Sequence, residues 1–292
     1  MRAPSMTAAP GWPMVEAVCL SLLSTSFTMA DRLTKTPGSA VYRVALPTGH
    51  EHASVIIKLY TGPSRWKAAR EHQVVMHLSG EEQFGVPSVL GSGQVPGADA
   101  VALVLEDLGT TTLHKAVDEG VLSHPKALSE IGRLLACFHR VPRQPNSEPR
   151  LAAQIADLSR RVPDDLGRRT RVRLDRIAAL SEGRRGVWCH GDLHMDNVLL
   201  RPGPYLIDFE HVGDNLAEWD LAQTAVTADA TARADRAPLL AGYRDEVCEE
   251  LLSGLVLFQT LRGWWWAAVH EKRDVRLWES RLALALDPSI PT

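Results

Sequence analysis

The sequence contains few cysteines, few lysines and almost no net charge. Its 292 residues include four cysteines, Cys19, Cys137, Cys189 and Cys248, without a C-x-x-C pair. Neither a disulfide framework nor a zinc site is therefore expected, and a reducing, cytoplasmic location is favoured. The formal net charge of −3 gives no reason to expect binding to nucleic acid. Arginines outnumber lysines 26 to 6, so each of the few lysines calls for a specific explanation.

No apolar stretch is long and uninterrupted enough to indicate a transmembrane helix. Met14–Leu23 contains Glu16 and lacks a cleavage pattern of small residues, so it is predicted as a helix leading into the first strand rather than a signal peptide. Leu251–Val269 contains Gln259 and Arg262. Because a charged side chain is costly in a lipid-facing span, this run is predicted as a buried helix and no membrane partner is expected.

Short β-branched or alternating runs dominate the first hundred residues. Strands are expected at Phe27–Leu33, Val41–Leu46, Ala53–Tyr60, Ser88–Gly91 and Val101–Glu106, with one helix over about Ser64–Leu78. Beyond Gly109 the period becomes helical, with one apolar face formed by Leu128, Ile131, Leu134, Leu135 and Phe138. Short strands return at Gly186–Cys189, Val198–Leu200 and Tyr205–Asp208, and the chain is expected to be helical from Leu216 onward.

Strands first and helices later indicate an α+β fold with two lobes. Residues 1–107 are predicted to form an N-terminal lobe with an antiparallel β-sheet and one main helix. Residues 108–292 are predicted to form a mostly helical C-terminal lobe. The Arg-rich stretch 148–185, with ten basic and six acidic side chains, is interpreted as a solvated helix pair rather than an anion site.

Polar residues are concentrated between two apolar strands, in the segment Cys189–Leu200. Asp208 ends the next apolar run, where an uncompensated carboxylate would cost roughly several kcal/mol, so a metal ion or a cationic partner is expected beside it. Phosphoryl transfer needs a carboxylate for the attacking hydroxyl, two oxygen ligands for Mg²⁺, a lysine for the phosphates and an acidic partner for that lysine. The chain offers, in that order, Asp192, Asn197 with Asp208, Lys58 and Glu71.

The motif His190-Gly191-Asp192, with Asn197 five positions after Asp192 and Ile207-Asp208 further on, resembles that of aminoglycoside phosphotransferases and choline kinases. The resemblance implies a protein-kinase-like fold of two lobes, with ATP and Mg²⁺ as cofactors. It also implies the residue roles: Asp192 as catalytic base, Asn197 and Asp208 as metal ligands, Lys58 on the phosphates, Glu71 as its helix partner, and Asp220 as a brace for the backbone of the catalytic loop.

The same resemblance suggests further contacts to the nucleotide. The adenine is expected to bond to backbone groups of Glu106, Asp107 and Leu108, which connect the two lobes. The turn Thr34–Ala40 would cover the phosphates with backbone N–H groups and Ser39, although it carries one glycine where protein kinases carry three. The metal-binding segment reads Asp-Phe-Glu rather than Asp-Phe-Gly.

The acceptor is less well defined by the sequence. Residues 205–274 hold thirteen acidic and six basic side chains. The run Trp264-Trp265-Trp266 on a helix would point in three directions, so at least one indole should face a cleft or a partner. These features favour a cationic, hydroxylated acceptor, with Glu210, Asp214 and Trp265 as candidate contacts. A solvated acidic surface with buried indoles is an equal alternative.

We therefore expect transfer of the ATP γ-phosphate to a hydroxyl of a small, cationic molecule. An antibiotic such as an aminoglycoside is the first hypothesis, and choline, an amino alcohol or a sugar is the second. The alternation of His190, Asp192, His194 and Asp196 is also typical of a dinuclear metal hydrolase, but the other histidines form no matching cluster. A pseudokinase-like binding module is a further alternative, disfavoured because every chemical part is present.

Overall fold

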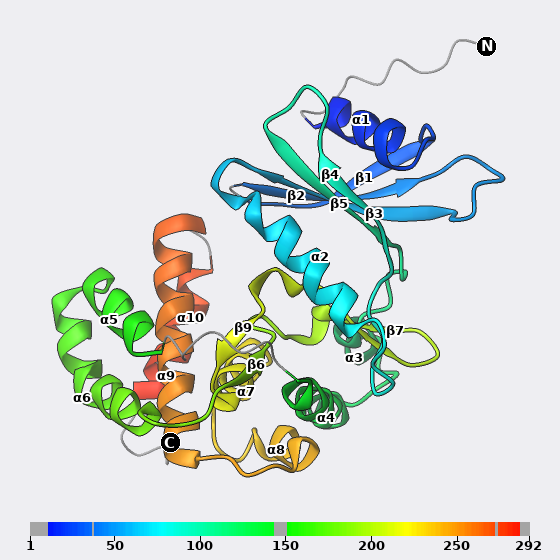
Figure 1. Ribbon diagram of the computed structural model, residues 1–292. Helices are drawn as coiled ribbons and strands as arrows, with labels where there is room; N and C mark the ends of the chain where they lie inside the picture. Colours follow the sequence, from blue (N-terminus) through cyan, green and yellow to red (C-terminus); the bar gives the residue numbers. More distant parts are fainter. Residues whose placement is uncertain (1–10, 37, 143–150, 272–273, 287–292) are drawn as a thin grey trace. The chain divides into compact units, whose positions relative to one another are not determined.

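The structure is a computed structural model that describes residues 11–36, 38–142, 151–271 and 274–286. The chain divides into two compact units (Figure 1). The first comprises the described residues up to Thr110 together with Arg201–Glu210, and the second comprises Thr111–Leu200 together with the described residues from His211 onward. The roles predicted for residues 1–107 in nucleotide binding and for residues 108–292 in acceptor binding stay predictions.

The first unit is built on a five-stranded antiparallel sheet with the strand order β1-β2-β3-β5-β4. Its elements are α1 (Trp12–Leu22), β1 (Met29–Thr36), β2 (Ser39–Ala45), β3 (Ser54–Thr61), a 3₁₀ turn (Gly62–Ser64), α2 (Trp66–Leu78), β4 (Val89–Gln94), β5 (Ala100–Glu106) and β8 (Pro204–Leu206). The predicted order of strands and helices in this part of the chain is confirmed.

The central strand β3 directs its side chains alternately to the two faces of the sheet, as the pleat requires. Ile57 and Leu59 belong to the core that α1 closes on one face. Tyr60 packs against Ala68 of α2 on the other face, and Figure 1 shows the two helices on opposite sides of the sheet. Lys58 therefore lies on the α2 face and is only 8% exposed, which distinguishes it from a surface lysine.

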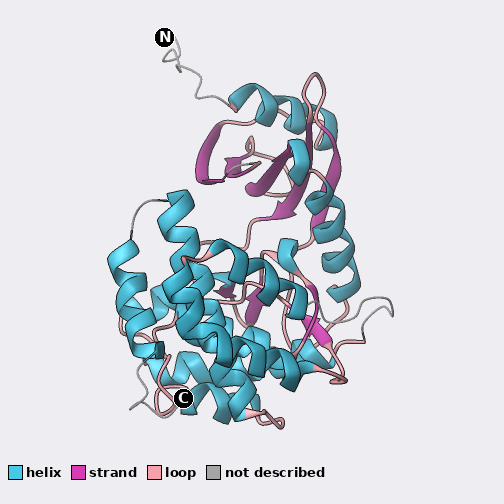
Figure 2. Cartoon of the chain, turned by 90° about the vertical axis from the view of Figure 1, so that its left-hand side faces the viewer, coloured by secondary structure: helices cyan, strands magenta, loops and turns pink. Residues whose placement is uncertain are grey.

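The second unit is mostly helical (Figure 2). Its elements are α3 (Leu113–Asp118), α4 (His124–Arg140), α5 (Leu151–Arg161), α6 (Asp164–Ser181), β6 (Val187–Cys189), a 3₁₀ turn (Met195–Asn197), β7 (Val198–Leu200), β9 (Gly213–Asn215), α7 (Ala217–Thr227), α8 (Ala237–Tyr243), α9 (Glu249–Trp266), a π-helical turn (Ala267–Glu271) and α10 (Val275–Leu286). A further 3₁₀ turn (Phe209–His211) lies where the chain returns to this unit. β6 pairs with β9 in an antiparallel arrangement, and β9 was not predicted.

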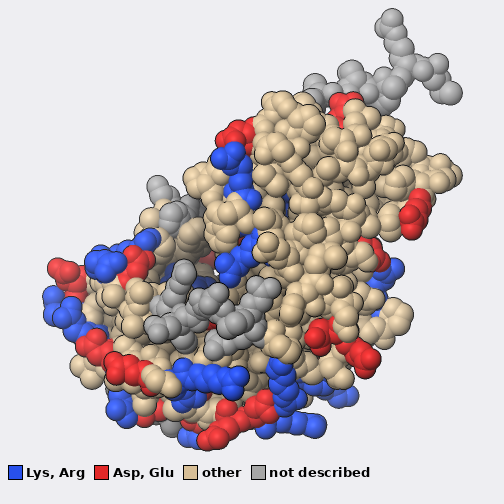
Figure 3. Space-filling model, in the orientation of Figure 1, with Lys and Arg blue, Asp and Glu red and all other residues tan. Residues whose placement is uncertain are grey.

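The apolar periodicity of the second unit is borne out by burial. The predicted face of α4 is buried, and so is every residue of α9 from Leu251 to Leu261. The described part of the Arg-rich stretch forms α5 and α6, with surface ion pairs such as Arg160–Asp157 and Arg176–Glu250. Figure 3 shows basic and acidic side chains interspersed on one face of the molecule. Among the described helices, none has the length and apolar character needed to cross a membrane.

Helices α4 and α8 approach each other closely because glycines lie at their contact. A Cβ atom added at Gly132 would collide with the carbonyl oxygen of Leu239, and one added at Gly242 would collide with that of Ser129. Both obstacles are backbone atoms, which cannot move aside as the end of a flexible side chain can. The two glycines therefore set the separation of these helices.

We expect Gly132→Ala to destabilise the protein by about 2 kcal/mol, because the added methyl group forces the helices apart. Gly167→Ala in α6 is the matched control, since its Cβ would meet only Val162 Cγ2 at an ordinary 3.7 Å. The control should be neutral or slightly stabilising, as alanine favours a helix interior by roughly 1 kcal/mol over glycine. Thermal unfolding measures both variants, and equal melting temperatures would contradict the proposed role of Gly132.

Candidate active site

An ion-pair cluster around the buried Lys58 joins three of the predicted residues within the first unit. The Nζ atom of Lys58 donates to Glu71 Oε1 at 2.6 Å and to Asp208 Oδ1 at 2.7 Å. Burial alone would lower the pKa of Lys58, but the carboxylates of Asp208 and Glu71 outweigh that effect and raise the pKa. Lys58 is therefore charged at neutral pH. The cationic partner that the sequence required for Asp208 is this lysine.

The carboxylate of Glu71 is fully buried. It accepts hydrogen bonds from side chains of β3 and from the backbone of the segment after β8. Besides Lys58, the backbone N–H of Phe209 lies 3.3 Å from Oε1, and the hydroxyl of Tyr60 donates to Oε2 at 2.7 Å. Sequence reasoning missed Tyr60. The available signal was its position two residues after Lys58 on the same strand, which places both side chains on one face of the sheet.

Asp208 adopts a backbone conformation that residues other than glycine rarely use. Its φ is +69°, in the left-handed region that is unfavourable for a residue with a Cβ atom. The predicted strand Tyr205–Asp208 was therefore too long: β8 ends at Leu206, because a residue with positive φ cannot continue an extended strand. Such conformations are concentrated at functional sites.

The residue two positions further on, Glu210, is also held by a lysine of the first unit. Lys67 Nζ of α2 donates to Glu210 Oε1 at 3.0 Å, and both side chains are largely buried. The acidic group that replaces the glycine of Asp-Phe-Gly is thus engaged within its own unit. Its predicted contact with the acceptor stays a prediction.

The connection between β1 and β2 is shorter than predicted. Thr34, Lys35 and Thr36 continue the ladder opposite Val41, Ala40 and Ser39, so most of the expected turn Thr34–Ala40 belongs to the strands, and residue 37 lies outside the described residues. The hydroxyls of Thr36 and Ser39 are 2.6 Å apart. Gly38 has a φ of +88°, and its carbonyl accepts from the N–H of Thr61 at 2.9 Å. Ser39 thus lies at the start of β2, opposite Thr36 at the end of β1.

The connector after β5 is held by side-chain hydrogen bonds. Asp107 accepts from Arg43 at 2.7 and 3.0 Å, from Ser54 Oγ at 2.7 Å and from the N–H of Gly109 at 2.9 Å. Burial alone would raise the pKa of Asp107, but the hydrogen bonds from Arg43, Ser54 and Gly109 outweigh it and lower the pKa. The carboxylate is therefore occupied in fixing the connector.

The neighbours of Asp107 are engaged in a similar way. Glu106 accepts from Ser88 Oγ at 3.0 Å and from Arg201 at 2.9 Å. Leu108 is buried. The two acidic side chains are therefore engaged in the fold, and the contact of the connector backbone with an adenine stays a prediction.

In the second unit, Asp220 of α7 braces the backbone of the predicted catalytic loop. Its fully buried carboxylate accepts from the N–H of His190 at 2.7 Å and from that of Gly191 at 2.9 Å. The loop turns at Gly191, where φ is +82° and a Cβ atom would lie 2.5 Å from the carbonyl oxygen of His211. The bracing role predicted for Asp220 is confirmed.

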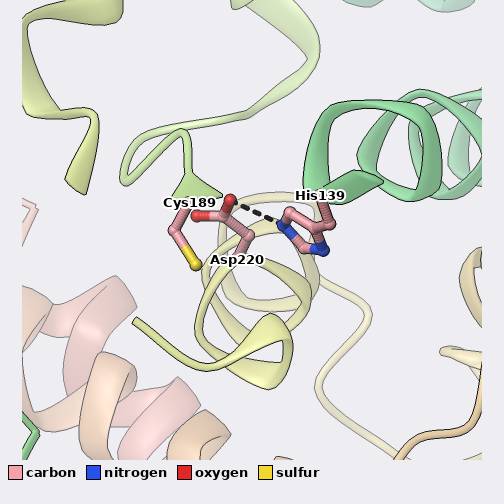
Figure 4. A group of neighbouring side chains, drawn as sticks. All are labelled: His139, Cys189 and Asp220. Carbon is pink, nitrogen blue, oxygen red and sulfur yellow. Dashed lines mark hydrogen bonds and ion pairs between the residues drawn. The ribbon is translucent and has the colours of Figure 1, made fainter. Parts of the chain in front are cut away.

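Asp220 also belongs to a buried cluster with His139 and Cys189 (Figure 4). His139 Nε2 lies 3.1 Å from Asp220 Oδ2, and the Cys189 thiol donates to the carbonyl of Leu216. These three side chains lie close together, and their polar atoms are engaged within the chain: the thiol with Leu216, and the two nitrogens of His139 with Asp220 and Tyr243. The group found among the described residues contains none of His190, Asp192, His194 and Asp196. The geometry therefore does not support the alternative of a dinuclear metal hydrolase.

The carboxylate of Asp192 is oriented from α7 as well. Gln223 Nε2 donates to Asp192 Oδ1 at 3.2 Å, and Arg262 of α9 donates to Gln223 Oε1 at 3.2 Å. The guanidinium of Arg262 lies 5.3 Å from the ring centroid of Trp219. Burial lowers the pKa of Arg262, and the Asp192 carboxylate opposes that shift. Sequence reasoning missed Gln223, although Arg262 was visible as a charge inside an apolar helix.

Asn197 is placed beside Asp192 by the loop itself. Its Nδ2 donates to the carbonyl oxygen of Asp192 at 2.8 Å, and the residue is 7% exposed. With the nitrogen committed to this bond, Oδ1 is the atom of the amide suited to a metal. An amide oxygen is among the oxygen donors that Mg²⁺ accepts, so the donor chemistry of Asn197 fits the predicted metal, and its role as a metal ligand stays a prediction.

The predicted acceptor contacts of the second unit lie in different surroundings. Asp214 is in β9, with Trp188 as its backbone partner. Trp265 is partly buried, and the guanidinium of Arg161 lies 5.0 Å from its ring centroid, whereas Trp266 is 44% exposed. The indoles are thus not all core residues. The ring of Trp265 therefore already has a cation of the protein, Arg161, beside it.

The fold of the chain is that of protein-kinase-like phosphotransferases. An aminoglycoside 2'-phosphotransferase-IIIa in complex with GDP aligns with a TM-score of 0.72 and 12% identity, over 95% of this chain and 99% of that one. A spectinomycin phosphotransferase in complex with ADP and spectinomycin aligns at 0.62 and 14%, over 94% of each chain. A choline kinase from Cryptosporidium parvum Iowa II aligns at 0.62 and 14%, over 88% of each. Identities this low establish the fold alone.

The family is established by the sequence of the chain. The model of the phosphotransferase enzyme family matches residues 38–255, which is most of the chain, and the chain belongs to that family. The predicted resemblance, the predicted fold and the predicted enzyme class, a small-molecule phosphotransferase, are confirmed. No curated relative matches the chain at a significant level.

We expect Asp220→Asn to lower stability by about 2 kcal/mol, because an amide nitrogen would face N–H groups that are buried and require an acceptor. The control is Asp235→Asn, the same change at an exposed carboxylate, which should leave the melting temperature within a degree or so. Thermal unfolding of both variants tests the brace. A melting temperature for Asp220→Asn equal to that of the control would show that the loop does not depend on it.

Proposed function

We propose that the protein transfers the γ-phosphate of ATP to a hydroxyl group of a small molecule. The observation that carries this proposal is the ion-pair cluster in which Lys58 Nζ lies 2.6 Å from Glu71 Oε1 and 2.7 Å from Asp208 Oδ1. A lysine held by an acidic residue, next to a carboxylate suited to a metal, is the arrangement that phosphoryl transfer requires. The family of the chain supports this reading.

In this proposal the nucleotide binds to the first unit. Lys58 holds the α- and β-phosphates while Glu71 fixes the position of its ammonium group. The adenine bonds to the backbone of Glu106, Asp107 and Leu108, which the side-chain contacts of Asp107 hold in place. Ser39 and the backbone near it cover the phosphates. Two of the structural neighbours contain ADP or GDP, which supports a purine nucleotide as the donor.

Asn197 and Asp208 would hold Mg²⁺ through an amide oxygen and a carboxylate. The bound ion would neutralise charge that develops on the phosphates. Asp192 accepts the proton of the acceptor hydroxyl and orients that oxygen towards the γ-phosphorus. Gln223 keeps the Asp192 carboxylate in one orientation through Oδ1, so this base is positioned before the acceptor arrives.

For the acceptor, we propose a cationic, hydroxylated antibiotic such as an aminoglycoside. The excess of acidic over basic residues between positions 205 and 274 supports a cationic ligand, and Glu210, Asp214 and Trp265 are the candidate contacts. Trp265 would offer its indole ring to a cation of the ligand in place of Arg161. A choline-like alcohol, an amino alcohol or a sugar is the second proposal, since a choline kinase shares the fold.

Asp192→Ala should abolish transfer, by at least a hundredfold, because the acceptor hydroxyl loses its general base. The affinity for MgATP should change less than twofold, since Asp192 does not contact the nucleotide in this proposal. Asp208→Ala should instead weaken MgATP binding itself, because a metal ligand is removed. Calorimetric titration with MgATP and a phosphate-transfer assay separate the two variants, and near-normal turnover of Asp192→Ala would rule out its assignment.

The acceptor can be found by incubating the protein with MgATP and a panel of aminoglycosides, choline-like alcohols and sugars. Nucleotide consumption and the mass of the acceptor identify a phosphorylated product. A product from the antibiotic group supports the first proposal, and one from the other groups supports the second. Nucleotide binding without any transfer across the panel would favour a pseudokinase-like binding module, and no nucleotide binding would count against all of these functions.

A further inference from the structure

We propose that Tyr60 is a positioning residue for the phosphate-binding lysine: its hydroxyl anchors Glu71 so that Glu71 can hold Lys58. The inference rests on the proposed nucleotide role of Lys58. It concerns a contact within the first unit, the 2.7 Å hydrogen bond from Tyr60 Oη to Glu71 Oε2.

The fold fixes Tyr60 firmly in the place that this role requires. Tyr60 is in register with Val101 of β5, and its ring packs with Ala68 of α2 and Leu103 of β5. The side chain is 1% exposed. A rigid ring on the central strand therefore presents a hydroxyl to α2, with few conformations to lose on forming the bond.

The two oxygens of Glu71 have different partners. Oε1 faces Lys58 at 2.6 Å and the N–H of Phe209 at 3.3 Å, whereas Oε2 faces Tyr60. With Oε2 held by Tyr60, rotation of the carboxylate about its last bond would break a short hydrogen bond. Glu71 Oε1 therefore stays directed at Lys58 Nζ, and this bond holds the ammonium group in one position.

The charge balance explains why a neutral donor is needed. The cluster contains one ammonium group, that of Lys58, against the carboxylates of Glu71 and Asp208. Glu71 is fully buried, and a buried carboxylate needs several hydrogen bonds to remain charged. Tyr60 supplies one such bond without adding a charge. Burial and the nearby Glu71 raise the pKa of Tyr60, so the phenol keeps its proton and acts as a donor.

This arrangement matters most when phosphates bind. The phosphates attract Lys58, and the lysine can shift its bond from Asp208 to them while Glu71 keeps its place. Without Tyr60, Glu71 would depend on Lys58 and the Phe209 N–H alone and would follow the lysine. The affinity for a phosphate-bearing nucleotide therefore depends on Tyr60, whereas the affinity for a nucleoside without phosphates does not.

The test is calorimetric titration of wild type and Tyr60→Phe with MgADP and with adenosine. Tyr60→Phe keeps the ring and removes only the donor. We expect MgADP to bind about tenfold more weakly, the scale of one hydrogen bond to a charged group, with adenosine affinity unchanged. Tyr42→Phe is the matched control, because Tyr42 is equally buried in the same sheet but faces the core closed by α1. It should bind both ligands like wild type.

A double-mutant cycle separates positioning from a general loss of structure. In a Glu71→Gln background, adding Tyr60→Phe should weaken MgADP binding by less than twofold further, because the two residues act through one contact. If Tyr60→Phe does not fold, Tyr60→Met replaces it, since methionine fills apolar space without a donor.

Wild-type affinity of Tyr60→Phe for MgADP would overturn the inference and leave the proposed function standing. Equal weakening for MgADP and adenosine would also overturn it, because that result indicates a distorted unit rather than a displaced lysine. Failure of the wild-type protein to bind either ligand would overturn the proposed function, and the inference with it.

Discussion

One buried ammonium group compensates two carboxylates in the first unit, and the placement of three chain segments depends on that interaction. Lys58 comes from β3, Glu71 from α2, and Asp208 from the segment after β8. Because the buried carboxylate of Glu71 would be costly without a cation and Asp208 pairs with the same ammonium group, the strand, the helix and the returning segment are kept together. The same interaction explains why Asp208 can retain an unfavourable left-handed backbone.

The second unit uses a helix face instead of an ion pair to position its chemistry. Residues 220, 223 and 224 of α7 are neighbours on one face at helical spacing. Through Asp220, Gln223 and Thr224 that face binds the loop at four consecutive residues, from His190 to Leu193. A short loop with a left-handed glycine would otherwise be free to fluctuate. The predicted base is thus held by α7 through its carboxylate and by its own loop through its carbonyl oxygen.

Several polar side chains of the two units hold other groups in place and take no direct part in the proposed reaction. Asp107, Glu106, Asp220 and Tyr60 carry hydrogen bonds that hold backbone or other side chains. Phosphoryl transfer requires few reacting groups in the protein but an accurate arrangement of them. The low sequence identity to proteins of the same fold fits this division, because different residues can provide the same support.

The sequence by itself determined the order of the elements, the α+β fold and the family. Periodicity of apolar residues records which face of a strand or helix is buried, and the spacing of His190, Asp192, Asn197 and Asp208 is a local pattern within the chain. Only the tertiary structure decided that Tyr60 binds Glu71, that Gln223 orients Asp192, that Arg161 lies beside Trp265, and that β8 ends before Asp208. Three of these are contacts between side chains of different elements, and the fourth is a change of backbone conformation. The strand period places Tyr60 on the same face as Lys58 but does not show its hydrogen bond, because a tyrosine or glutamine that forms one buried hydrogen bond looks the same in a sequence as one that forms none.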